Sequence, residues 1–171
     1  MEEIEVLKCK ALDDYLAEEK YTQVEDLMTT CAVNVAASAT SIMIDVYKVR
    51  GTRGTPFLDS IKSDLQIIIK HAAVMAHCLG LNIPELEEIE EFYENELPIE
   101  SKMDTILSCL SIQHVSSSFV AEYFAGELDE DSPVDLDMMQ VGIIDIIANT
   151  YAICQRFKFD FTKVIVYGDS P

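Results

Sequence analysis

The stretch that decides the fold is residues 61–81, IKSDLQIIIKHAAVMAHCLGL. Its apolar side chains recur at intervals of three and four residues, which places them on one buried face of an α-helix. The apolar stripe consists of Ile61, Leu65, Ile68, Ala72, Met75 and Leu79. Gly80 follows the stripe and is a typical helix terminator. The stretch therefore predicts a long helix packed against other helices.

A matching stripe lies 78 residues further along the chain: Met139, Ile143, Ile146, Thr150, Ile153 and Phe157. Residues 80–83 (GLNI) and 158–161 (KFDF) follow the two helices, and Thr55-Pro56 and Ser132-Pro133 precede them as an N-cap with proline in the first turn. We interpret this repetition as an internal duplication, with repeats at about residues 22–97 and 101–167.

The remaining signals also favour helices. Thr22 and Ser101 are each followed three residues later by an acid, which predicts capping boxes. The predicted helices cover about residues 22–50, 55–79, 84–96, 101–124 and 132–158, with an acidic loop at 126–131 and a segment at 164–167 that is compatible with extended structure. We expect one all-α domain over residues 1–171, in which two helical hairpins form a four-helix-bundle core with extra short helices.

The chain is strongly acidic, with 12 Lys and Arg against 31 Asp and Glu, a net charge of −19. This balance excludes direct nucleic-acid binding through phosphate contacts and argues against a membrane-surface role. The sequence predicts neither a signal peptide nor a segment of about 18 uncharged apolar residues. Five cysteines without a CxxC pair are typical of core thiols in a reducing compartment, so we expect a cytoplasmic protein.

Residues 145–165, DIIANTYAICQRFKFDFTKVI, resemble the closing segment of MazG-like all-α nucleoside triphosphate pyrophosphohydrolases. In that family an E-x-x-E helix and an E-x-x-D helix hold Mg²⁺, which activates water for cleavage between the α- and β-phosphates. At the E-x-x-D positions this chain has Gly142 and Asp145 in one half, and Asp64 and Ile67 in the other. The E-x-x-E positions align best with Gln113 and Ser116, and with Asn34 and Ala37.

The resemblance therefore implies a MazG-like scaffold with an eroded metal site, in which Asp64 and Asp145 are the retained candidate Mg²⁺ ligands. Further candidate ligands, or simply solvated acids, are Asp45, Glu122, Asp59 and Asp137. Arg50 and Arg53 lie in a basic loop that is either a phosphate-binding segment or a plain surface loop. The acidic helix at 85–96 is either a surface for a basic partner or a solvated helix.

Three hypotheses about function follow. The leading one is a non-catalytic nucleotide-binding or protein-interaction and regulatory protein. The alternatives are a Mg²⁺-dependent nucleoside triphosphate pyrophosphohydrolase and an acidic decoy of a nucleic-acid-binding protein. The candidate partners are accordingly a nucleotide or a basic protein, and the candidate assemblies are a monomer with an internal pseudo-two-fold axis or a homodimer.

Overall fold

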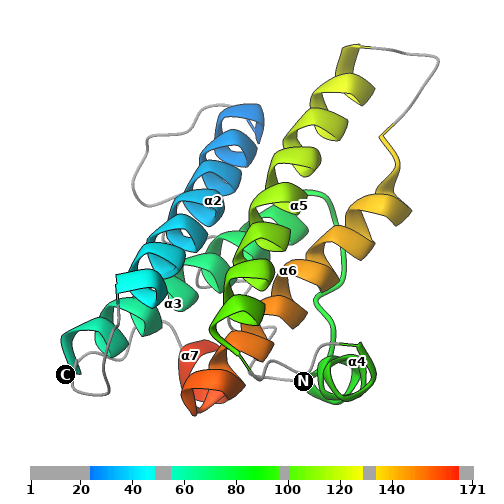
Figure 1. The fold of residues 1–171 in the computed structure, drawn as a ribbon. Coiled ribbons are helices and arrows are strands. Elements are labelled where there is room, and N and C mark those ends of the chain that lie inside the picture. Colours follow the sequence, from blue (N-terminus) through cyan, green and yellow to red (C-terminus); the bar gives the residue numbers. More distant parts are fainter. Residues whose placement is uncertain (1–23, 49–54, 97–100, 129–133, 166–171) are drawn as a thin grey trace.

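The computed structural model describes residues 24–48, 55–96, 101–128 and 134–165 (Figure 1). Within these ranges there are six helices and no strand, which confirms the all-α prediction. The helices are α2 (Val24–Lys48), α3 (Thr55–Cys78), α4 (Leu86–Glu96), α5 (Lys102–Leu128), α6 (Leu136–Phe157) and α7 (Phe161–Ile165).

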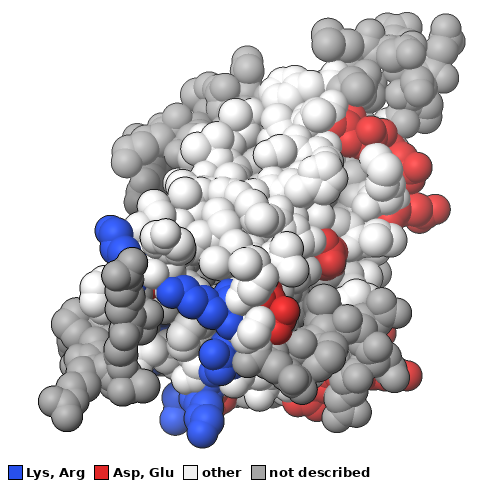
Figure 2. Space-filling view, in the orientation of Figure 1, with Lys and Arg blue, Asp and Glu red and all other residues white. Residues whose placement is uncertain are grey.

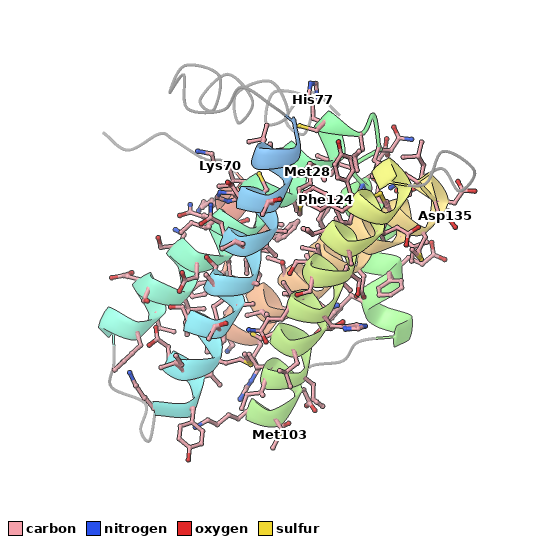
Figure 3. All side chains as sticks on the ribbon, turned by 90° about the horizontal axis from the view of Figure 1, so that it is seen from above. Met28, Lys70, His77, Met103, Phe124 and Asp135 are labelled. Atoms are coloured by element: carbon pink, nitrogen blue, oxygen red, sulfur yellow. The ribbon has the colours of Figure 1, made fainter. Side chains whose placement is uncertain are left out.

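The four long helices pack in a closed set of contacts. Helix α2 packs against α3 and α5, α5 packs against α6, and α3 packs against α6. Helices α2 and α5 run antiparallel, so that Met28 near the start of α2 lies at the same end of the molecule as Phe124 near the end of α5 (Figure 3). The short helices are exchanged between the pairs: α4 follows α3 but packs on α6, and α7 follows α6 and packs on α3.

The two predicted apolar stripes form the centre of the core. All members of both stripes are buried except Leu79 and Phe157, which pack against the core at the helix ends. Full burial of one Ile, Leu or Met side chain stabilises a fold by about 1.5–3 kcal/mol, so these stripes are a main source of stability.

Helices α2 and α5 bury the same positions at a spacing of 77 residues. In α2 these are Met28, Cys31, Ala32, Val35, Ala39, Ile42 and Val46. In α5 they are Thr105, Ser108, Cys109, Ile112, Ser116, Phe119 and Tyr123. The candidate E-x-x-E pairs, Asn34 with Ala37 and Gln113 with Ser116, are 79 residues apart and therefore do not occupy matching positions in these helices.

Helices α3 and α6 end in the same backbone conformation. Gly80 and Lys158 are both left-handed, with φ of 66° and 57°. In each case the N–H of the next residue donates to the carbonyl five residues earlier, at 2.8 Å after Gly80 and 2.9 Å after Lys158. This is the Schellman arrangement, which satisfies carbonyls at a helix end.

The helix starts and ends partly differ from the prediction. Ser101 forms the predicted capping box, because its N–H donates to Asp104 Oδ2 at 2.8 Å and Asp104 N–H donates to Ser101 Oγ at 3.2 Å. Helix α6, however, begins at Leu136 and not at Ser132, because Asp135 is the N-cap and accepts from Met138 N–H. The predicted cap at Thr22 lies outside the described residues.

Two further boundaries are corrected. Helix α5 continues to Leu128 through part of the predicted loop at 126–131, since a single glycine within a helix costs only about 1 kcal/mol. The first two residues of the segment at 164–167 belong to helix α7, so the extended interpretation is wrong there.

One helix among the described residues is long and apolar enough to cross a membrane by length and composition. It covers Leu27–Lys48, with a mean hydropathy of 1.5, so the expectation that no segment has these properties is wrong. A core helix passes the same test, and 44% of this apolar window is buried inside the fold.

Candidate binding groove between α5 and α6

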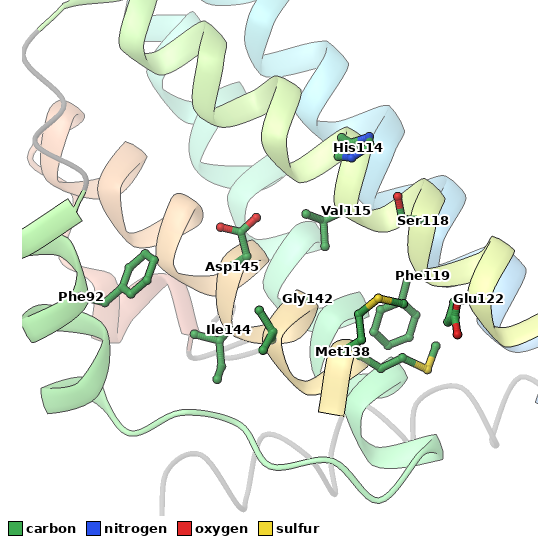
Figure 4. Close-up of a pocket in the computed structure, with 12 residues that line it drawn as sticks. Phe92, His114, Val115, Ser118, Phe119, Glu122, Met138, Gly142, Ile144 and Asp145 are labelled. Atoms are coloured by element: carbon green, nitrogen blue, oxygen red, sulfur yellow. The ribbon is translucent and has the colours of Figure 1, made fainter. Parts of the chain in front are cut away.

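A pocket of about 360 Å³ lies along the contact between α5 and α6 and reaches α4 (Figure 4). Its lining is mostly apolar and comprises Phe92, His114, Val115, Ser118, Phe119, Glu122, Met138, Met139, Val141, Gly142, Ile144 and Asp145. We call this site the α5–α6 groove. Its size and apolar lining with a few polar groups are typical of binding sites.

Gly142 brings the backbone of α6 against the side chains of α5. A Cβ atom at this position would lie 3.2 Å from Val115 Cγ1 and 3.5 Å from Phe119 Cδ2. A longer side chain at 142 would therefore have to displace these residues or enter the space that they line. Glycine at this point lets α6 approach α5 closely beside the groove that both helices line.

A carboxylate lies at each end of the groove. Asp145 is beside Phe92 and Ile144 at one end, and Glu122 is beside Met138 at the other (Figure 4). Both oxygens of Asp145 are engaged within the protein. Oδ2 accepts from Ser111 Oγ at 3.0 Å, and Oδ1 accepts from Asn149 Nδ2 at 3.0 Å.

The part of the chain that builds the groove is also the acidic part. Between Lys70 and Arg156 the sequence contains one cation, Lys102, and seventeen acids. In Figure 2 the acidic side chains gather on the side of α4 and α6, whereas the basic ones lie on the opposite, lower side. The groove therefore lies in a strongly negative field, which attracts cations and repels anions.

In the first half of the chain, Asp64 lies between α3 and α2. Its pKa is raised, mainly because burial removes water from the carboxylate and also because Asp45 is close, while hydrogen bonds from Ser41 and Ser38 oppose the shift. The Oδ2 atom of Asp64 is buried and has no hydrogen-bond partner among the described residues.

The candidate Mg²⁺ ligands thus fall into two separate groups. Asp64 is close to Asp45 between α2 and α3, whereas Asp145 and Glu122 line the α5–α6 groove. Among the described residues no group of three or more His, Cys, Asp or Glu side chains can hold a metal ion. The four-carboxylate arrangement that the resemblance implies is therefore not assembled within the described ranges.

The remaining predicted site residues contribute to neither group. Asp59 and Asp137 are exposed, on α3 and α6 respectively, and neither lines the groove. Arg50 and Arg53 lie outside the described residues.

The side chains of His71, Cys109 and Cys154 are buried in the core. His71 Nδ1 donates to the Ile67 carbonyl at 2.7 Å, and its Nε2 lies 3.0 Å from Asn34 Nδ2, an arrangement that suits a neutral ring. Burial lowers the pKa of His71. Burial also raises the pKa of Cys109 and Cys154 to about 12, so these thiols are not nucleophiles near neutral pH.

Sequence reasoning did not identify the groove. The available signals were exposed apolar residues beside a buried stripe, Met138 and Val141, and an isolated glycine within a helical pattern, Gly142. Comparisons of the chain with protein families, curated proteins and solved structures find no match.

Proposed function

We propose that this chain is a non-catalytic binding protein that receives a basic, amphipathic segment of a protein partner in the α5–α6 groove. The observation that carries this proposal is an apolar groove with a carboxylate at each end. An amphipathic segment would place its apolar side chains in the groove and its Lys or Arg side chains near Asp145 and Glu122.

We also propose that the fold arose by internal duplication of a helical hairpin, which gives a four-helix core, and that the chain is related to MazG-like proteins. The duplication is supported by the matching burial of α2 and α5, the matching ends of α3 and α6, and the exchanged packing of α4 and α7. The kinship rests on residues 145–165.

A Mg²⁺–triphosphate site does not fit the described residues. Asp64 and Asp145 belong to different hairpins, and among the described residues no group of three or more His, Cys, Asp or Glu side chains can hold a metal ion. The groove lining contains no Lys or Arg, so phosphate oxygens would meet carboxylates without compensation. These features favour a protein partner over a nucleotide, and we derive no hydrolytic step.

The test uses the full-length protein and a fluorescent, helical Leu/Lys peptide, with a scrambled peptide of the same composition as the control. Binding is followed by fluorescence anisotropy in the wild type, Met138→Ser and Leu136→Ser. Met138 lines the groove, whereas Leu136 does not, and their side chains are 49% and 48% exposed. We expect M138S to weaken binding at least about fivefold, with L136S within about twofold of wild type.

A second pair of variants tests the charges. Glu122→Gln removes a groove carboxylate, and Asp137→Asn removes an exposed one outside the groove. We expect E122Q to weaken binding more than D137N does, and added salt to weaken binding in both. Equal binding of the scrambled peptide, or equal effects within both pairs, would favour the acidic decoy, which needs charge but no groove.

Catalysis is tested directly. Incubation with Mg²⁺ and a panel of nucleoside triphosphates is expected to release no pyrophosphate. Turnover that disappears in Asp64→Ala or Asp145→Ala would overturn the non-catalytic proposal and favour the pyrophosphohydrolase.

A further inference from the structure

Two stretches of this acidic chain contain no charged side chain, residues 27–44 in α2 and residues 105–121 in α5. One face of each stretch is buried, and the opposite face is exposed. The exposed face carries apolar side chains at helical spacing: Val33, Ala37 and Ile44 on α2, and Leu107 and Leu110 on α5. We call these five residues the α2–α5 face.

These two exposed ridges lie side by side. Gln113 of α5 donates to the Ala36 carbonyl at 3.4 Å, and Lys102 Nζ donates to the Tyr47 carbonyl at 2.9 Å, so α2 and α5 are in contact along their length. Figure 2 shows a broad uncharged area over the middle of the view, where α2 and α5 lie in Figure 1.

We propose that the α2–α5 face binds the same face of a second copy of this chain, forming a two-fold symmetric dimer. The first argument is electrostatic. Each copy has a net charge of −19, so most approaches between two copies bring carboxylates together. The α2–α5 face carries no charged side chain of its own, so contact through it brings fewer carboxylates together than other approaches do.

The second argument is size. A helical stretch as long as residues 27–44 extends about 27 Å, and two adjacent helices present a width of roughly 20 Å. The projected area is on the order of 500 Å², and the accessible area is larger because side chains project from it. This is comparable with the roughly 800 Å² that each partner contributes to a standard interface.

The third argument is symmetry. Val33 and Leu110 lie 77 residues apart, at matching positions of two antiparallel helices. The face therefore has similar ridges in both directions, and a two-fold dimer would bring this same patch of each copy together. Small exposed side chains such as Ala37 leave grooves into which the larger side chains of another helix fit.

A lipid surface is a less suitable occupant of this face. Asp45 directly follows Ile44 in α2, and the chain has a net charge of −19, which anionic lipid headgroups repel. A second copy of the chain offers uncharged protein surface instead. Vesicle binding is therefore an outcome that would contradict the proposal.

The test is sedimentation equilibrium of the full chain over roughly 1–100 μM, the range of modest interfaces, at about 0.1 M and about 0.5 M salt. The variants are the double substitution Val33→Lys/Leu110→Lys and the control Leu136→Lys. The exposed fractions of Leu110 and Leu136 are 46% and 48%, but Leu136 lies on α6. Circular dichroism checks that each variant remains folded.

We expect a dimer that is tighter at the higher salt, because screening reduces repulsion between the copies. V33K/L110K should weaken dimerisation at least about tenfold, since each substitution enters the interface twice and buries a charge. L136K should leave the dimer intact. A monomer at all concentrations, a dimer that persists in V33K/L110K, or binding of the monomer to phosphatidylcholine vesicles would overturn the proposal.

Discussion

The hairpins α2–α3 and α5–α6 carry different residues at a matching position. This position is 64 in the first hairpin and 142 in the second, 78 residues apart. In the first hairpin, the Asp64 side chain packs against Ser38 and Ser41. In the second, Gly142 has no side chain and faces Val115. In the first half a polar side chain thus lies between the two helices, whereas in the second half a glycine lines a groove between them.

A second difference concerns the polar contacts across each pair. The first hairpin joins its helices through Asn34 and His71. The second joins them through Ser111 and Asp145, with Asn149 at the position that matches His71. The two halves therefore share their core packing, whereas they differ in the side chains available for binding.

The largest expected effect tests the shared packing. Ile68→Ala and Ile146→Ala remove fully buried side chains at matching positions. Each substitution should lower the free energy of unfolding by about 2–5 kcal/mol, and by similar amounts, because each leaves a cavity in the same core. Urea denaturation measures this, with Leu136→Ala as the exposed control. A negligible effect of either core substitution would contradict the equivalence of the halves.

The next effect exchanges the difference between the halves. Gly142→Asp places the side chain of the first hairpin into the second. Crowding against Val115 and Phe119 should lower stability by about 1–3 kcal/mol, and filling the groove should weaken Leu/Lys peptide binding at least about tenfold. Gly142→Ala, which adds only the Cβ atom, should have smaller effects on both. Unchanged peptide binding by G142D would show that the groove is not the binding site.

The third prediction concerns pH and His71. Because the folded-state pKa of His71 is lowered, the unfolded chain binds more protons between that pKa and about 6.5. The contribution of His71 is thus fully present above about pH 6.5 and is lost as the pH falls. His71→Asn, which imports the residue of the second hairpin, should flatten this dependence in urea denaturation between about pH 5 and 7. The exposed His77→Asn should not flatten it.

The smallest effect concerns Asp64. Its raised pKa means that the folded state binds more protons than the unfolded state, so ionisation of Asp64 destabilises the fold as the pH rises through that pKa. Asp64→Asn should therefore stabilise the protein near neutral pH, by less than about 1 kcal/mol because the site is partly solvated. The gain should vanish in acid, and thermal unfolding at two pH values measures it. Lower stability of D64N at neutral pH would instead indicate that the ionised carboxylate has a favourable role.

The sequence predicts the packing of this protein better than its site. The stripes of Ile61 and Met139 and the terminators Gly80 and Lys158 are local patterns, and each is confirmed. The predicted start of α6 at Ser132 is wrong, because Ser132 and Asp135 are both good N-cap residues and the local sequence does not choose between them. The groove was missed because its openness depends on which α5 side chains meet Gly142, which periodicity along one helix does not specify.

The measurement that tests the groove most directly is a methyl NMR titration of the full-length protein with the Leu/Lys peptide. We predict saturable shifts at Met138, Val141 and Ile144, which line the groove, and none at the buried α2 residues Met28 and Val35. Shifts confined to Val33, Leu107 and Leu110 on the α2–α5 face, or no saturable shifts, would contradict the account.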